Sequence, residues 1–273
     1  MSVIIGVAGT KQSGKSSLCK YLLCCFHALI YNAKNKEKKI DLSKIIHIDD
    51  GSIGYEEGYK FPLHDIWENV YNVKIYSFAD KLKEFCIDVM GLKEEHCYGT
   101  DEQKNSYTDL VWDNLPYRIK AYYSNETIET TDQTTEHISK YEIPVERSGF
   151  MTGREVMQVF ATDVMRNMWD DTIWAKSTIR AIKKDVCSLS LISDLRFKSE
   201  VDLLLEQPNS YLIYLKRKLF YDKHKSEVDL IDYDFTKWGA NITEIENTNK
   251  KISEKNAEAL EFLKKIFKSQ FDH

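Results

Sequence analysis

An α/β fold is predicted for this chain: a three-layer core with a parallel sheet of about five strands and helices on both faces. Three observations predict it. A β-branched run near the N-terminus leads into a glycine-rich loop and then into apolar residues at helical spacing. Short apolar runs alternate with helical patterns over most of the chain. With 273 residues, of which 42% are hydrophobic, the chain can bury the core of one large domain with insertions.

The N-terminal strand, loop and helix contain the most specific pattern of the sequence. Residues 3–7 are typical of a buried strand, and the apolar positions of residues 18–29 recur at helical spacing. Between them, the loop from Gly9 to Ser16 reads G-x-x-x-x-G-K-S. Its glycines allow consecutive backbone N–H groups to face an anion, next to the positive end of the following helix. This pattern defines a phosphate-binding loop, so we expect the chain to bind a nucleoside triphosphate.

The side chains of this loop fit a nucleotide bound with a metal ion. The Lys15 ammonium can reach the β- and γ-phosphates, and the Ser16 hydroxyl can ligate Mg²⁺. We therefore expect ATP and Mg²⁺ as cofactors. The loop residues expected to contact ATP are Gly9, Gln12, Ser13, Gly14, Lys15, Ser16 and Ser17.

Charge and cysteine content exclude several classes of protein. The net charge of −5 argues against a nucleic-acid-binding surface, which would need a basic footprint. No apolar run approaches the roughly 20 residues of a membrane span, and no signal peptide precedes the first strand. The six cysteines show neither C-x-x-C spacing nor a paired framework. We expect a soluble protein of the reducing cytoplasm, without nucleic-acid or membrane partners.

The rest of the chain is predicted to alternate between strands and helices. Further strands are expected at residues 44–48, 73–78, 186–192, 211–215 and 242–245. Helices are expected at residues 80–90, 152–168, 170–184 and 197–207 and at the C-terminus. The polar segments 31–72 and 100–149 are interpreted as insertions into a single domain covering residues 1–273. The charged stretch 217–240 is interpreted as a lid that closes over substrates.

The predicted helix 152–168 has one polar and one apolar side. Arg154, Gln158 and Thr162 follow one another at intervals of four, which places them within about 80° on the helix surface. Apolar residues at 156, 160 and 164 occupy the other side and are expected to face the core. A solvated surface would more often contain Lys and Glu. From the spacing alone, both a binding role and a solvated surface stay open.

Several motifs then follow one another in a familiar order. They are the loop itself, Phe78-Ala79-Asp80-Lys81-Leu82-Lys83, Arg154-x-x-Met157-Gln158-x-x-Ala161-Thr162-Asp163 with Trp174 after it, Asp194-Leu195-Arg196-x-x-x-Glu200, His224-x-Ser226-Glu227, and Asn247. Together they resemble the motifs of the deoxynucleoside monophosphate kinases of large tailed phages. The resemblance covers residues 1–30, 73–99 and 150–265. The chain departs from the family pattern at Ala161, where a glycine is usual, and at Asp80-Lys81, where a small residue and proline are usual.

The resemblance implies transfer of the ATP γ-phosphate to a (deoxy)nucleoside monophosphate, for the supply of DNA precursors. It implies that Lys83 and Arg154 hold the acceptor α-phosphate, since arginine suits a bidentate grip on phosphate. The substrate-binding residues that it implies are Lys11, Phe78, Lys83, Arg154, Gln158, Thr162, Trp174, Asp194, Arg196 and Glu200. The catalytic residues that it implies are Lys15, Asp194 and Arg196, with Arg217 clamping the donor phosphates and Asp194 as a second candidate for Mg²⁺ after Ser16. The partners are small-molecule nucleotides, and a homodimer stays open as the assembly.

Two other functions compete with this interpretation. The expected strand 44–48 ends at Asp49-Asp50, which resembles the end of a strand in nucleoside kinases, where a carboxylate accepts the proton of a ribose hydroxyl. A nucleoside kinase, or another small-molecule kinase, therefore remains an alternative. A non-catalytic switch module that binds a nucleoside triphosphate is an alternative of a different class.

Overall fold

The computed structural model describes residues 2–10, 13–34, 39–47, 53–55, 73–116, 147–217 and 229–271. Contacts between residues divide the chain into two compact units. Unit 1 comprises Met1–Phe78 and Ala175–His273, and unit 2 comprises Ala79–Trp174. Each unit is described by itself below.

A five-stranded sheet forms the centre of unit 1. Its strands are β1 (Val3–Gly9), β4 (Val73–Tyr76), β7 (Leu189–Leu195), β8 (Ser210–Lys216) and β9 (Ile242–Glu246). They lie in the order β4-β7-β1-β8-β9, and every neighbouring pair is parallel. This confirms the predicted α/β class with a parallel sheet.

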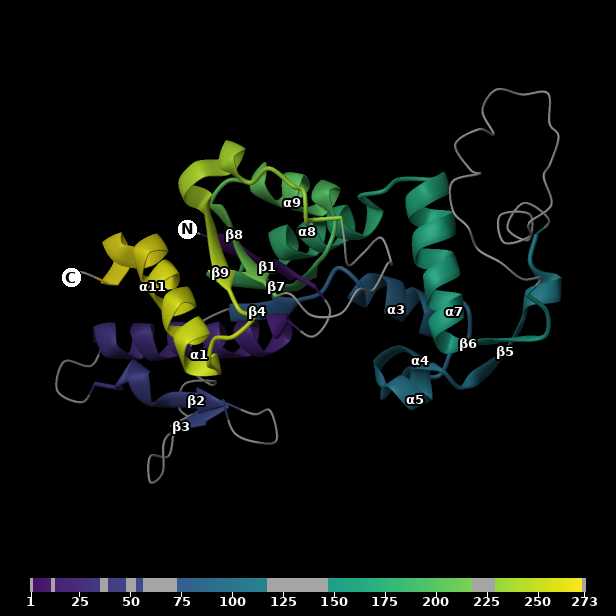
Figure 1. Cartoon of the computed structure of the whole chain (residues 1–273), viewed down its shortest axis with the longest axis horizontal. Coiled ribbons are helices and arrows are strands. Elements are labelled where there is room, and N and C mark those ends of the chain that lie inside the picture. The colour runs from purple at the N-terminus through teal and green to yellow at the C-terminus, as the bar shows by residue number, and fades with distance from the viewer. Residues whose placement is uncertain are drawn as a thin grey trace. The chain divides into compact units, whose positions relative to one another are not determined.

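Helices cover both faces of this sheet (Figure 1). The helices α1 (Lys15–Lys34) and α11 (Ile252–Phe271) lie on one face. The helices α8 (Ile173–Asp185) and α9 (Lys198–Leu205) lie on the other. Strand residues that are two apart point to the same face. The architecture is thus the three-layer core expected around a phosphate-binding loop.

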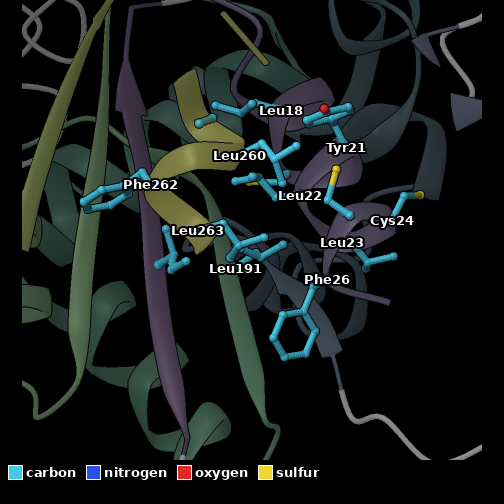
Figure 2. Close-up of a cluster of buried hydrophobic side chains, with 14 of the residues drawn as sticks. Leu18, Tyr21, Leu22, Leu23, Cys24, Phe26, Leu191, Leu260, Phe262 and Leu263 are labelled. Carbon is cyan, nitrogen blue, oxygen red and sulfur yellow. The ribbon is translucent and has the colours of Figure 1, made fainter. Parts of the chain in front are cut away.

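The main hydrophobic core lies between the sheet and the pair α1 and α11. Figure 2 shows Leu18 and Leu22 of α1 beside Leu260 and Leu263 of α11, with Leu191 of β7 nearby. All five side chains are buried. Burial of each such side chain contributes roughly 1.5–3 kcal/mol, so this layer holds the N-terminal end of α1 in a fixed place at the sheet.

The carboxyl ends of the strands meet at one edge of the sheet, because all the strands are parallel. The chain runs from β1 to β4, returns to β7 beside β1, and then crosses to β8 on the other side of β1. Ligands of open parallel sheets bind outside the carboxyl ends of the strands, where the connections change direction in this way. The first residues after β1, β4, β7 and β8 are Thr10, Ser77, Arg196 and Arg217.

Two short elements of unit 1 lie outside the central sheet. The strands β2 (Ile45–His47) and β3 (Ile53–Tyr55) pair antiparallel in a sheet of their own, after a 3₁₀ turn, η1 (Leu42–Lys44). The expected strand at 44–48 therefore exists but is not part of the parallel sheet. Asp49 and Asp50, on which the nucleoside kinase alternative depends, lie outside the described residues.

Unit 2 is built mainly from short helices around a core of its own. Its elements are α3 (Asp80–Asp88), α4 (Glu94–Tyr98), α5 (Asp101–Lys104), β5 (Tyr107–Val111), η2 (Trp112–Asn114), β6 (Phe150–Thr152), α7 (Gly153–Gln158) and a π-helix, η3 (Val159–Arg166). The strands β5 and β6 pair antiparallel. Residues 100–116 and 147–149, which the sequence placed in an insertion, thus contribute to this unit. Residues 117–146 lie outside the described residues.

Two more predicted elements differ markedly from those observed. The strand expected at 186–192 is wrong by three residues at both ends, since β7 begins at Leu189 and ends at Leu195. Val186 instead closes the turn after α8 with a φ of 50° and is exposed. The helix expected at 152–168 continues as a π-helix from Val159. In the described part of the chain, no helix is both long and apolar enough to cross a membrane.

The second half of the predicted lid packs against the core of unit 1. Residues 229–241 end in a 3₁₀ helix, η4 (Thr236–Asn241). The buried ring of Phe235 stacks on Tyr214 of β8, with ring centroids 4.7 Å apart. Asp229 accepts a hydrogen bond of 2.7 Å from the backbone N–H of Lys198 at the start of α9. The first half, residues 218–228 with His224, Ser226 and Glu227, lies outside the described residues.

Candidate functional site

The phosphate-binding loop adopts the bends that its glycines were expected to allow. Gly9 has a φ of 148° and Gly14 a φ of 85°, values that favour glycine. A Cβ on Gly9 would also lie 2.8 Å from the backbone oxygen of Leu215. The backbone N–H of Ser13 donates to the Thr10 carbonyl at 3.2 Å. This bond joins the two described ends of the loop, before Lys11 and after Gln12. These two residues lie outside the described residues, so their predicted contacts are untested.

Lys15 lies folded over the loop at the start of α1. Its Nζ donates to the carbonyl oxygens of Gly9 and Thr10, both at 2.7 Å, and the residue is only 7% exposed. Ser16 and Ser17 follow it with exposed side chains. A buried ammonium and the positive end of a 20-residue helix therefore occur together where phosphates were expected to bind.

Asp194 is held at the carboxyl edge of the sheet near this loop. One of its carboxylate oxygens accepts from the Ser77 hydroxyl at 2.6 Å, and the other accepts from the backbone N–H of Phe78 at 2.7 Å. Burial raises the pKa of the Cys19 thiol on α1; the Asp194 charge raises it further, whereas the Lys15 charge lowers it. The charges of Asp194 and Lys15 therefore both act on Cys19 at the N-terminal end of α1.

Glu200 has the contacts of a helix cap. Its carboxylate, on a residue only 4% exposed, accepts from the backbone N–H of Arg196 at 2.9 Å and of Phe197 at 3.2 Å. These bonds fix the turn from β7 into α9 and hence the position of Arg196. The observed role of Glu200 is to shape this turn, and a contact with substrate stays a prediction.

The connection after β9 also reaches the loop. The Asn247 side-chain amide donates to the Ser13 carbonyl at 2.8 Å, and its backbone N–H donates to the Lys216 carbonyl at 2.7 Å. A Cβ built on Gly14 would lie 3.0 Å from Nζ of Lys255, on α11. Sequence reasoning included Asn247 through the family motif but missed Lys255, because no local pattern distinguishes it from the other lysines of the last helix.

Positive side chains from three helices gather in unit 2. Arg154 on α7 pairs with Asp101 on α5 at 2.5 Å. The Nζ atom of Lys83 on α3 lies 4.5 Å from the ring centroid of Tyr98. Burial lowers the pKa of Lys104 on α5, the Lys83 charge lowers it further and so does that of Arg154, whereas Asp101 raises it. Lys83, Lys104 and Arg154 therefore lie close enough to interact.

This cluster of Lys83, Lys104 and Arg154 can hold an anion. It contains both residues predicted to grip the acceptor α-phosphate, and it adds Lys104, which the sequence analysis missed. Lys104 was overlooked because it falls in a segment interpreted as an insertion without recognisable motifs. The available signal was the short helical pattern that follows Thr100, whose side chain caps α5 by accepting from the backbone N–H of Gln103.

The other predicted substrate contacts of unit 2 lie around the π-helix. Gln158 is exposed and Thr162 is half-buried, which leaves both side chains accessible. Trp174 packs against the core of unit 2 and donates from Nε1 to the carbonyl of Ala161 at 3.2 Å. Its ring lies 6.1 Å from that of Phe160. Trp174 thus has a structural role, and its half-buried ring also presents an apolar surface.

Asp163, on the same π-helix, should make the stability of the protein depend on pH. Burial raises the pKa of its carboxyl to about 7. The folded state therefore keeps this proton to a higher pH than the unfolded state, so the free energy of unfolding should fall as pH rises from about 4 to 7. An Asp163→Asn variant should lose this fall and exceed the wild type at pH 8 by at least about 1 kcal/mol. Urea unfolding at several pH values measures both, and parallel pH curves for the two proteins would contradict the prediction.

No cluster of three or more His, Cys, Asp or Glu side chains that could hold a metal ion occurs among the described residues. A Mg²⁺ ion bound with a nucleotide fits this arrangement, because Mg²⁺ is held mainly by phosphates and water with one or two protein oxygens. Ser16 next to Lys15 and the Asp194 carboxylate, both described, stay the predicted oxygen donors for it.

Comparison with known proteins gives one informative similarity. No family model matches the chain. A protein of Acanthamoeba polyphaga mimivirus, named "putative deoxynucleotide monophosphate kinase", is 26% identical over 158 residues, which are 56% of this chain and 67% of that protein. At this identity, the similarity supports a nucleotide kinase function at the level of the family alone.

Proposed function

We propose that the chain is a (deoxy)nucleoside monophosphate kinase that transfers the γ-phosphate of ATP to a monophosphate and releases ADP. The observation that carries this proposal is the buried Lys15 ammonium, folded over a glycine loop at the carboxyl edge of a five-stranded parallel sheet. The name of the mimivirus relative agrees with it. The cluster of Lys83, Lys104 and Arg154 in unit 2 supplies a second group of cations for the acceptor.

In this reaction the donor phosphates bind to the loop and to Lys15. The loop N–H groups and the positive end of α1 stabilise the negative charge of the β- and γ-phosphates. The Lys15 ammonium stabilises the negative charge that builds up on the transferring group and on the leaving ADP. Ser16, with Asp194 as a second candidate, would hold Mg²⁺, which when bound would neutralise further phosphate charge. Arg217, which follows β8, is proposed to clamp the same phosphates.

The acceptor monophosphate is proposed to bind to unit 2. Arg154 and Lys83, with Lys104 beside them, hold the α-phosphate, whereas Gln158 and Thr162 contact the base and sugar. An α-phosphate oxygen attacks the γ-phosphorus, a new P–O bond forms, and the bond to the β–γ bridging oxygen breaks. No general base is required, since the attacking oxygen is already anionic. Arg196 is proposed to stabilise the transferring group.

One assay tests this function against its alternatives. Purified protein is incubated with ATP, Mg²⁺ and, one at a time, each (deoxy)nucleoside monophosphate and each nucleoside, and ADP formation is measured. We expect ADP with at least one monophosphate and none with nucleosides. Turnover of nucleosides alone would establish the nucleoside kinase instead. Tight ATP binding without turnover on any acceptor would establish the switch module.

A further inference from the structure

Lys255 of α11 is buried beside the phosphate-binding loop. The residue is 3% exposed, and its Nζ lies 3.0 Å from the point that a Cβ on Gly14 would occupy. Gly14 immediately precedes Lys15. The hydrogen bond from Asn247 to the Ser13 carbonyl ties the chain just before α11 to the same loop. The ammonium of Lys255 is therefore part of the wall of the loop.

The position of this ammonium is electrostatically unfavourable. No carboxylate of the described chain forms an ion pair with it. Burial lowers the pKa of Lys255, and the positive charge of Arg217 lowers it further. Lys255 also lies in the first turn of α11, where the positive end of the helix disfavours a cation. A buried charge without an opposite charge is normally avoided in folded proteins.

A bound anion would remove each of these costs. It would pair with the buried ammonium, reduce the repulsion between Lys255 and Arg217, and interact favourably with the positive end of α11. One further polar atom of the loop, the buried Ser13 Oγ, has no hydrogen-bond partner within the described structure. The hydroxyl of Ser13 can donate to a phosphate oxygen.

We propose that Lys255 is a further donor-site residue, whose ammonium binds the polyphosphate of the nucleotide held by the loop. The inference rests on the proposed binding of ATP to this loop and does not require turnover of an acceptor. It assigns the last helix, which closes the core on the α1 face of the sheet, a direct contact with the donor. Lys15 and Lys255 would then contact the donor phosphates from two helices, α1 and α11.

The test replaces Lys255 by methionine, which keeps the apolar stem and removes the charge. The control is Lys265→Met, a change at an exposed lysine of the same helix. Thermal unfolding without nucleotide and calorimetric titration with a non-hydrolysable ATP analogue and Mg²⁺ are measured for both variants and the wild type. We expect Lys255→Met to unfold at the same or a higher temperature than the wild type, because an unpaired buried charge is gone. We also expect its Kd for the analogue to rise about tenfold or more.

The other possible results are equally decisive. A Lys255→Met protein that unfolds at a lower temperature and binds the analogue like the wild type would show a structural lysine and overturn the proposal. Lys255→Arg, which keeps a positive charge, should recover part of the affinity if charge is the cause. Where the wild type binds the analogue but phosphorylates no acceptor, the kinase proposal fails while the result for Lys255 still stands. Unchanged binding of the analogue by Lys255→Met, together with normal turnover, would overturn the proposal for Lys255 and leave the kinase proposal standing.

Discussion

Replacing Lys15 by alanine is expected to lower kcat at least 100-fold while the protein stays folded. The Lys15 side chain folds directly over the loop carbonyls, with both Nζ–O distances at 2.7 Å. Its charge stabilises the phosphoryl group as negative charge moves to the leaving ADP, and contacts of this kind typically supply 10²-fold or more. Initial rates with saturating ATP and monophosphate measure the effect.

The matched control is Lys20→Ala, which removes an exposed lysine from the same helix. Circular dichroism should show the same helix content for both variants, and only the change at Lys15 should affect kcat. If Lys15→Ala retained more than about a tenth of the wild-type rate, the assignment of the loop as the donor site would be wrong.

Much of the fold could be predicted because its signals are local in the sequence. The strand, loop and helix around Gly9 follow one another without interruption, and the strands β4, β8 and β9 appear as short apolar runs close to their observed bounds. The predicted start of β7 was wrong because Val186, a β-branched residue typical of strands, closes the turn after a helix with a positive φ. Propensity could not reveal that tertiary constraint.

Two other features of the fold, the pairing of β2 and the π-helix, could not be read from the spacing of apolar residues in the sequence. The run 44–48 looks like a core strand, yet β2 finds its partner in β3, only a few residues further on. The π-helix that begins at Val159 could not be predicted either, since its i→i+5 hydrogen bonds are not visible in the apolar pattern: Val156 is buried, and Phe160 and Val164 pack against the same core as expected. Local composition is the same for both helix types.

The residues that the sequence analysis named for the candidate site are those that belong to motifs. Lys15, Arg154 and Asp194 occur within recognisable patterns, and the structure gives each of them defined contacts. Lys104 and Lys255 were missed because their significance arises from neighbours distant in the sequence: Lys83 and Arg154 for the first, Gly14 and Arg217 for the second. A lysine on a short or terminal helix is ordinarily a solvated residue. Burial distinguishes Lys255, and its cationic neighbours distinguish the half-buried Lys104.

Arg154→Ala is expected to raise the KM for the monophosphate about tenfold or more, with a much smaller change in the KM for ATP. A guanidinium that grips a phosphate through charged hydrogen bonds contributes on this scale. Loss of the grip also misplaces the acceptor, so kcat should fall as well. Steady-state kinetics with each substrate varied in turn separate the two KM values.

The ion pair between Arg154 and Asp101 provides the decisive comparison. The Asp101 side chain is 72% exposed, and an ion pair so accessible to water contributes only about 0–1 kcal/mol to stability. If Arg154 serves mainly to form this pair, Asp101→Asn should impair the enzyme as much as Arg154→Ala does. If Arg154 binds the acceptor phosphate, Asp101→Asn removes a competing carboxylate, and the KM for the monophosphate should stay the same or fall. Equal losses in both variants would therefore refute the assignment of Arg154 to the acceptor site, and a loss confined to the arginine variant would support it.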